Sequence, residues 1–195
     1  MTHIEKVKHI REKTSSPMNK ISDALNKSNG DVDAAIEILI KEKQADANDM
    51  ANRVANSKIV YSYVHGNRVG AMIVLACQTD FVAKNEAFLN LAKDICMHIV
   101  STPVAPQYIS KSDISGAKVI DLSNDFLRDI PVNKPDAVKE KIVQGKLNKY
   151  YSDVCLLNQP FIKNDTITVE QLIKDVSSTL GEKIEITYFV KVVAQ

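Results

Sequence analysis

The stretch IVYSYVHGNRVGAMIVLAC, residues 59–77, carries the clearest structural signal in this chain. Its first part, Ile59 to His65, is rich in Val and Tyr, and its second part, Val69 to Cys77, is strongly apolar. Gly66-Asn67 lies between the two parts, and two β-prone runs joined by such a pair are typical of a β-hairpin. The sequence therefore predicts two antiparallel strands here.

The residues after the hairpin predict helices. One apolar stripe has helical spacing and consists of Phe88, Leu91, Ala92, Ile95, Cys96 and Ile99. Either Asp80 or Asn85 could cap the start of that helix. Further helices are expected within 122–130, after Pro135, and from the capping pair Thr168 and Gln171 to Gly181.

The C-terminal residues predict one more strand. Two sets of residues alternate along it. One set is apolar, Ile184, Ile186, Tyr188, Val190 and Val192, and the other consists of Glu185, Thr187, Phe189 and Lys191. This period of two is typical of a half-buried strand. Strands near 59–77 and 184–192 that are separated by helices indicate an α+β core, with a small antiparallel sheet packed on helices.

The first forty residues predict a compact module of three short helices. Their apolar residues recur at helical spacing, as in Val7 and Ile10, Ile21 and Leu25, and Ala35 and Leu39. The expected starts are Thr2 with Glu5, Ser16 before Pro17, and Asp31, and Asn29-Gly30 ends the second helix. Helices this short must pack against one another to be stable.

A polar, alanine-rich stretch follows this module. It lacks a steady apolar stripe, which indicates a solvated connector that could be helical. We therefore expect a three-helix module at 1–43, a polar connector at 44–57, and an α+β core at 58–195.

Composition excludes several classes of function. The chain has 195 residues, 45% of them hydrophobic, and a net charge of +1. This balance argues against nucleic acid or an anionic membrane as the main partner, because both select a basic excess. Three irregularly spaced cysteines make no disulfide framework, and no secretory or transit segment is recognisable, so we expect a cytoplasmic protein.

Candidate catalytic and metal sites are weak. Cys77, Asp80 and His98 could form a nucleophilic site, although a cysteine that ends an apolar strand usually packs as a small hydrophobe. The four histidines are scattered, there is no Cys-x-x-Cys, and no glycine-rich phosphate loop occurs. We expect no catalytic residue, no bound metal and no cofactor.

A basic helix is expected at 134–150, where four lysines occur: Lys139, Lys141, Lys146 and Lys149. A phosphate-binding face is conceivable. Because Asp136 and Glu140 interleave with the lysines and no aromatic platform accompanies them, a solvated helix face is the better interpretation.

The segment QTDFVAKN, residues 78–85, leaves two alternatives open. It places a carboxylate, Asp80, beside a large aromatic, Phe81, in a short polar turn. In one alternative Asp80 caps a helix and Phe81 folds back into the core, as most Phe residues do. In the other, Phe81 projects as a wedge into a pocket of a partner.

Several blocks of the chain resemble bacterial elongation factor Ts, in the short form of that family. Residues 76–85, ACQTDFVAKN, resemble its signature, and residues 10–14, 24–25 and 29–31 resemble its N-terminal ubiquitin-associated-like module. Residues 92–99, 141–147 and 156–162 resemble later blocks in the same order. The resemblance implies one core repeat and a homodimer. It also implies that the module at 1–43 docks on a partner and that the core at 58–195 serves dimerisation and exchange.

The resemblance also implies a function and the residues that perform it. The family exchanges guanine nucleotide on elongation factor Tu, in its GDP-bound and nucleotide-free states. Thr79, Asp80, Phe81 and Val82 would form the turn that disturbs the partner's magnesium site. Arg11, Met18, Asn19 and His98 would make the other contacts with the partner.

The chain departs from the family at three places. Asn19 stands where the family has the second of two paired methionines, residues 113–131 match poorly, and the C-terminal strand lacks the usual arginines. Two other functions fit parts of the sequence: an interaction adaptor that uses only the ubiquitin-associated-like module, and a cysteine-dependent hydrolase built on Cys77 and His98.

Overall fold

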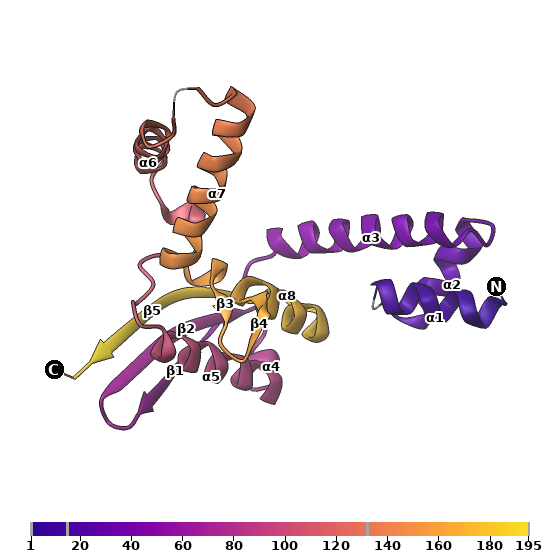
Figure 1. Cartoon of the computed structure of the whole chain (residues 1–195). Coiled ribbons are helices and arrows are strands. Elements are labelled where there is room, and N and C mark those ends of the chain that lie inside the picture. The colour runs from indigo at the N-terminus through magenta and orange to yellow at the C-terminus, as the bar shows by residue number, and fades with distance from the viewer. Residues whose placement is uncertain (1, 15, 132, 195) are drawn as a thin grey trace. The chain divides into compact units, whose positions relative to one another are not determined.

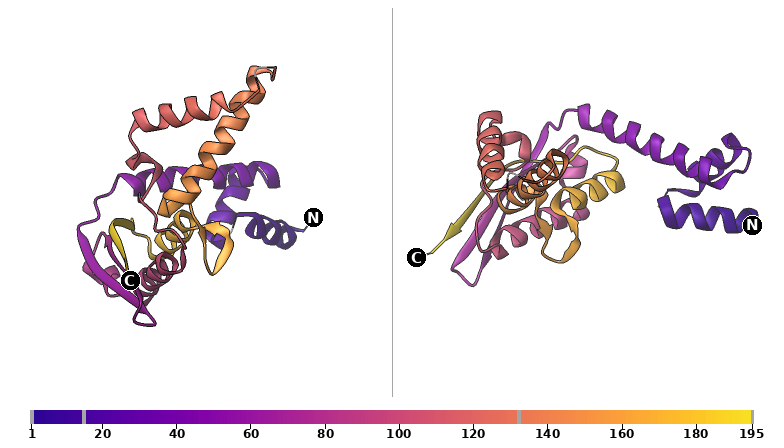
Figure 2. Two further views of the ribbon diagram at one scale, coloured as in Figure 1. Left: turned by 60° about the vertical axis from the view of Figure 1, so that its left-hand side comes forward. Right: turned by 45° about the horizontal axis from the view of Figure 1, so that its top comes forward.

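The computed structural model describes residues 2–14, 16–131 and 133–194, and within 43–51 it describes the backbone alone. The chain forms two compact units, residues 1–53 and 54–195. The fold class is α+β, as predicted: helices alone build the first unit, and a small antiparallel sheet with helices builds the second. Figures 1 and 2 show these elements from three directions.

The first unit consists of three helices, α1 (His3–Thr14), α2 (Met18–Lys27) and α3 (Val32–Asn52). The predicted stripes meet in one buried cluster that contains Val7, Ile10, Ile21, Ala24, Leu25, Ala35 and Leu39. Because each helix contributes to this cluster, each is held by burial of its apolar side rather than by its own helix propensity.

Most of the predicted helix ends in this unit are confirmed. Thr2 and Glu5 exchange their two capping hydrogen bonds, and the Asp31 carboxylate accepts from the amides of residues 33 and 34. Asn29 and Gly30, which follow the end of α2, both have positive φ, 53° and 81°. The predicted cap at Ser16 is wrong: Pro17 is the N-cap, because Ser16 lies one residue too early to reach the first amides of α2.

Helix α3 continues through most of the predicted connector and ends at Asn52. The expected solvation of the connector concerns side chains at 44–57, and those at 44–51 lie outside the described residues. Of the side chains at 52–57, all are exposed except Ser57, which is half-buried, and Ala55, which is buried. The proposed boundaries at 43 and 57 therefore stay a prediction.

The sheet of the second unit has the strand order β1-β2-β5, with β1 (Ser57–His65), β2 (Val69–Cys77) and β5 (Glu185–Val193). The predicted hairpin is confirmed, since β1 pairs with β2 along its whole length. Gly66 and Asn67 both have positive φ, 55° and 56°. Two positive φ values define the type I′ turn, whose twist matches that of the flanking strands.

Strand β5 differs from its predicted alternation. Leu75 of β2 pairs with Ile186, whereas its neighbour Val74 pairs with Tyr188, so Thr187 is an extra, bulged residue. A bulge moves every following side chain to the other face. Ile184 and Ile186 are buried as expected, but Tyr188 and Val192 are exposed.

One face of the sheet carries the core. Helices α4 (Asp80–Ala83), α5 (Glu86–Ser101) and α8 (Val169–Leu180) contribute to it, together with η2 (Leu156–Asn158). In Figure 1, α5 lies along the sheet, and its whole predicted stripe is buried. Thr168 caps α8 by accepting from the Gln171 amide, and Gly181 ends that helix with a φ of +71°.

A helical hairpin and a short ribbon complete the unit. The hairpin consists of α6 (Gly116–Arg128) and α7 (Asp136–Val154), which share a small cluster that includes Val143 and Leu147. Helix α6 begins before the predicted segment 122–130, and α7 ends after the predicted segment 134–150. Strands β3 (Pro160–Phe161) and β4 (Asn164–Thr168) form the ribbon, and η1 (Lys111–Asp113) precedes α6.

Candidate functional site

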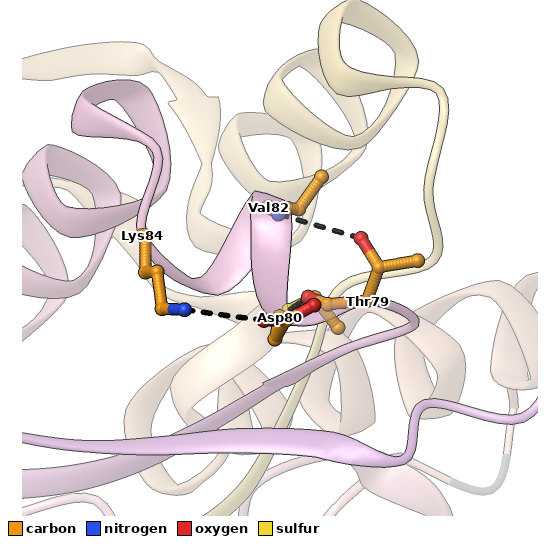
Figure 3. A network of polar contacts seen from close by, with 5 residues as sticks. Thr79, Asp80, Val82 and Lys84 are labelled. Carbon is orange, nitrogen blue, oxygen red and sulfur yellow. Dashed lines mark hydrogen bonds and ion pairs between the residues drawn. The ribbon is translucent and has the colours of Figure 1, made fainter.

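The turn at residues 79–85 is held by two successive helix caps. The Thr79 hydroxyl accepts a hydrogen bond from the Val82 amide at 3.4 Å, and this caps the single turn of α4 (Figure 3). The Asn85 side chain accepts from the Ala87 amide at 2.8 Å and caps α5. Asn85, rather than Asp80, is therefore the cap of the long helix, and Asp80 lies in the first turn of α4.

Phe81 projects into solvent, with 83% of its surface exposed. On the same helical turn, Ala83 is buried in the core and Val82 packs against it. A one-turn helix that points two of its side chains inward must point a third outward. The structure therefore favours the alternative in which Phe81 is free of the core.

Asp80 lies beside Phe81 on the exposed side of the turn. Its carboxylate accepts a hydrogen bond from the Lys84 ammonium at 3.1 Å, four residues along the chain (Figure 3). Both side chains are well exposed, so water competes with this ion pair and the pair holds the Asp80 side chain only weakly.

Glu182 is the residue of this region that sequence reasoning missed. It follows Gly181 at the end of α8, and its carboxylate accepts from the amides of Gln78 and Thr79, both at 3.0 Å. It also accepts from the Thr79 hydroxyl at 2.6 Å. No local pattern signals this contact, because Glu182 is 103 residues from Thr79.

His98, predicted to contact the partner, lies inside the second unit with 2% of its surface exposed. One ring nitrogen, Nδ1, accepts from the Ile162 amide at 3.3 Å, so the other, Nε2, donates to the Gln159 side chain at 3.0 Å. Burial lowers the pKa of this imidazole. In this structure His98 supports the segment 159–162 and does not reach solvent.

The remaining predicted contact residues belong to the first unit. Arg11 lies on α1, and Met18 and Asn19 lie in the first turn of α2. All three are exposed, so each is available to a partner.

Cys77 lacks the environment of a nucleophile. It is fully buried and its thiol donates to the Thr79 carbonyl at 3.1 Å. Burial raises its pKa, with a further contribution from the nearby Glu182 carboxylate, which disfavours the reactive thiolate. Burial also raises the pKa of Cys96 to about 11.

Within the described ranges, no group of three His, Cys, Asp or Glu side chains is placed to hold a metal ion. Across the same residues no helix has the length and apolar content that a membrane span requires. The basic helix α7 pairs three of its lysines with aspartates: Lys139 with Asp136, Lys146 with Asp129 and Lys149 with Asp153. These pairs fit a solvated helix face.

A second exposed apolar feature lies on the sheet. The face directed away from α5 carries large apolar side chains from all three strands, and we call it the outer face: Val60, Val64, Met72, Tyr188 and Val192. An antiparallel sheet that faces water usually has polar residues on that side. Large exposed apolar residues that gather on one face of a sheet are typical of an interaction surface.

Known proteins match this chain over almost its whole length. The family model described as Elongation factor TS matches residues 2–194. The chain is 42% identical over 185 residues to Elongation factor Ts of Thermodesulfovibrio yellowstonii, which covers 95% of this chain and 92% of the relative. It is 40% identical over 194 residues to Elongation factor Ts of Acetivibrio thermocellus, covering 98% and 89%, and 40% identical over 188 residues to that of Desulforamulus reducens, covering 95% and 85%.

Proposed function

The chain belongs to the elongation factor Ts family and has its role in translation elongation, and on that premise we propose that it is a guanine-nucleotide exchange factor for elongation factor Tu. The observation that carries the proposal is the exposure of Phe81 on a turn that is capped at Thr79. A large apolar side chain held out in water on a short, fixed turn is suited to a pocket on another protein.

The proposed mechanism is displacement of the partner's magnesium support. A translational GTPase holds its nucleotide through a phosphate-binding loop and a magnesium ion that neutralises phosphate charge. Phe81 enters an apolar pocket beside that ion. The Asp80 carboxylate leaves Lys84 and binds polar groups of the partner. Thr79 and Val82 keep the turn in shape while Phe81 is inserted.

Exchange of this kind requires no covalent chemistry from the factor. The protein lowers the affinity of elongation factor Tu for nucleotide. By thermodynamic linkage, nucleotide lowers the affinity of elongation factor Tu for the protein to the same extent. Release is accelerated through a transient complex of partner, nucleotide and factor. The buried, high-pKa thiol of Cys77 agrees with a protein that acts by binding rather than by nucleophilic attack.

Other residues contribute to docking in this proposal. Arg11, Met18 and Asn19 bind the partner from the three-helix module, where all three are exposed. His98 contributes indirectly, because its ring is bonded to Gln159 and to the Ile162 amide. It supports the exposed Ile162, which lies on the surface next to it.

We further propose that the protein is a homodimer in the cytoplasm, without nucleic acid or membrane as a partner. Its outer face supports this, because two copies that pack these faces together would remove Val60, Tyr188 and Val192 from water. A two-fold interface uses the same patch on both chains, and two sheets can pack face to face.

The experiment that tests exchange is release of labelled GDP from purified elongation factor Tu. Wild-type protein is expected to accelerate release strongly, and Phe81→Ala is expected to lose most of that acceleration. Its circular dichroism should be unchanged, because an exposed side chain contributes little to the fold.

Ile120→Ala is the matched control, since Ile120 is a large exposed apolar residue on α6. It should accelerate release as the wild type does. Full activity of Phe81→Ala would contradict the wedge. Binding of the wild type without any acceleration would favour an adaptor that uses the three-helix module alone.

A further inference from the structure

Glu182 connects the end of α8 to the turn that carries Phe81. Helix α8 is anchored in the core by Val169 and Ile173, and it ends at Gly181 in the left-handed conformation. The Ser177 hydroxyl donates a hydrogen bond to the Glu182 carbonyl, which fixes the Glu182 backbone against α8. From there the side chain reaches the residues that leave β2.

We propose that Glu182 is a positioning residue for nucleotide exchange, which holds the Asp80-Phe81 turn in the geometry that Phe81 needs to enter the partner. This inference rests on the exchange function proposed above. Glu182 need not contact the nucleotide or the magnesium ion. It acts through Thr79, the residue that caps the turn.

The hydrogen bonds of Thr79 show how this works. Its hydroxyl donates to one carboxylate oxygen of Glu182 at 2.6 Å and accepts from the Val82 amide at 3.4 Å. The other carboxylate oxygen accepts from the Thr79 amide. Thr79 is thus held on both its backbone and its side chain, and hydrogen bonds to an ionised acceptor are short and strong.

The turn needs such support because it is small. Helix α4 has four residues, and a helix of one turn has no stability of its own in water. Ala83 anchors its end in the core, whereas its start, next to Phe81, is exposed. The contacts from Glu182 supply the missing anchor at that start.

The test measures GDP release from elongation factor Tu at increasing concentrations of the full-length factor. Glu182→Ala removes all three contacts and should lower the rate at saturating factor by roughly 10-fold or more, because a small displacement of a positioned group is costly. The concentration that gives half of the maximal rate should change less, since the other docking surfaces are intact. Glu182→Gln keeps an acceptor oxygen without the charge, so its rate should be intermediate.

The same substitution in a Phe81→Ala background distinguishes positioning from a general loss of structure. If Glu182 acts through Phe81, Glu182→Ala should change the residual rate of Phe81→Ala by less than about 2-fold, as expected for two members of one network. Glu185→Gln is the matched control, because Glu185 lies three residues further on and pairs with Lys183 instead. It should behave as the wild type.

Three outcomes would overturn the proposal. A wild-type rate for both Glu182→Ala and Glu182→Gln at saturating factor, with Phe81→Ala inactive, would refute the role of Glu182 alone. An equal loss in both backgrounds would make Glu182 a general structural residue. Full activity of Phe81→Ala would refute the wedge, and the role of Glu182 with it. Glu182→Gln preserves the size of the side chain, so it decides the question if Glu182→Ala does not fold.

Discussion

Phe81 and the outer face of the sheet are both apolar and both exposed, but they are built in different ways. Phe81 is a single side chain, 83% exposed, on a one-turn helix that is capped at Thr79 and held by Glu182. The outer face is a broad surface to which three strands contribute, and the pairing of the sheet holds it in place.

The difference indicates what each can bind. One projecting ring fits a pocket, and its energy is concentrated in a few contacts, as in the hot spots of protein interfaces. A flat apolar surface has no projection, so it is best covered by another flat surface. We therefore propose that the turn serves exchange and the outer face serves self-association, and the following predictions test whether the two are separable.

The largest effect is expected for Val192→Asp on the outer face. In a two-fold dimer it would place two carboxylates in an apolar interface, which costs several kcal/mol and should weaken association by roughly 10³-fold or more. Light scattering should then give a mass near 21.6 kDa in place of twice that value. The rate of GDP release per chain should change by less than about 3-fold, since distant sites act independently.

The matched control is Ile120→Asp, because Ile120 and Val192 are 61% and 62% exposed and Ile120 lies on α6. It should leave the mass at the dimer value. A wild-type protein that is monomeric at all concentrations would refute the dimer.

The second-largest effect is expected at Phe81, where a substitution should change exchange and leave self-association intact. Phe81→Ala should lower the acceleration of GDP release by roughly 30- to 1,000-fold, which corresponds to about 2–4 kcal/mol at a hot spot. The free energy of unfolding in urea should change by less than about 0.5 kcal/mol. A change of solution mass in this variant would contradict the separation of the two regions.

A smaller effect is expected in the first unit, which lies outside both regions. Asn19→Met restores the residue of the family pattern at an exposed position of α2. It should lower the factor concentration for half-maximal exchange by roughly 5-fold, because an apolar side chain adds about 1 kcal/mol to a contact. The maximal rate should not change, since Phe81 is untouched. Lys20→Met, at the next position of the same helix, is the control.

The smallest effect is expected for Lys84→Ala, which breaks the pair with Asp80. Because both groups are exposed, the free energy of unfolding should change by less than about 1 kcal/mol. Exchange should rise slightly, by no more than about 2-fold, if Asp80 must leave Lys84 to bind the partner. A large loss of exchange would show that Lys84 itself contacts the partner.

Much of this fold could be predicted because its signals are local. The two positive φ values at Gly66 and Asn67 and the cap at Asp31 each depend on residues within a few positions of one another. The stripe of α5 likewise follows from helical spacing, and burial of Phe88 and Ile95 confirms it. Short-range geometry of this kind is written directly into residue order.

The candidate site was only partly predictable. The sequence placed Thr79, Asp80 and Phe81 together, but it left the direction of Phe81 open, since a Phe in a polar turn can fold back or project. Burial of Ala83 decides that direction. His98 was expected at the surface, and its ring is buried because Gln159 and Ile162, more than sixty residues away, close over it.

Residue order alone was enough for most of the helices, the hairpin, the family and the residues of the turn, because these depend on spacing, turn chemistry and motif. Three features arise only when distant segments meet. Pairing with β2 places the bulge at Thr187 and so turns Tyr188 and Val192 onto the outer face. Glu182 reaches Thr79 across 103 residues, and packing of α4 against the core leaves Phe81 outside it. Contacts between distant segments depend on the packing of the whole unit, and no local pattern in the chain specifies them.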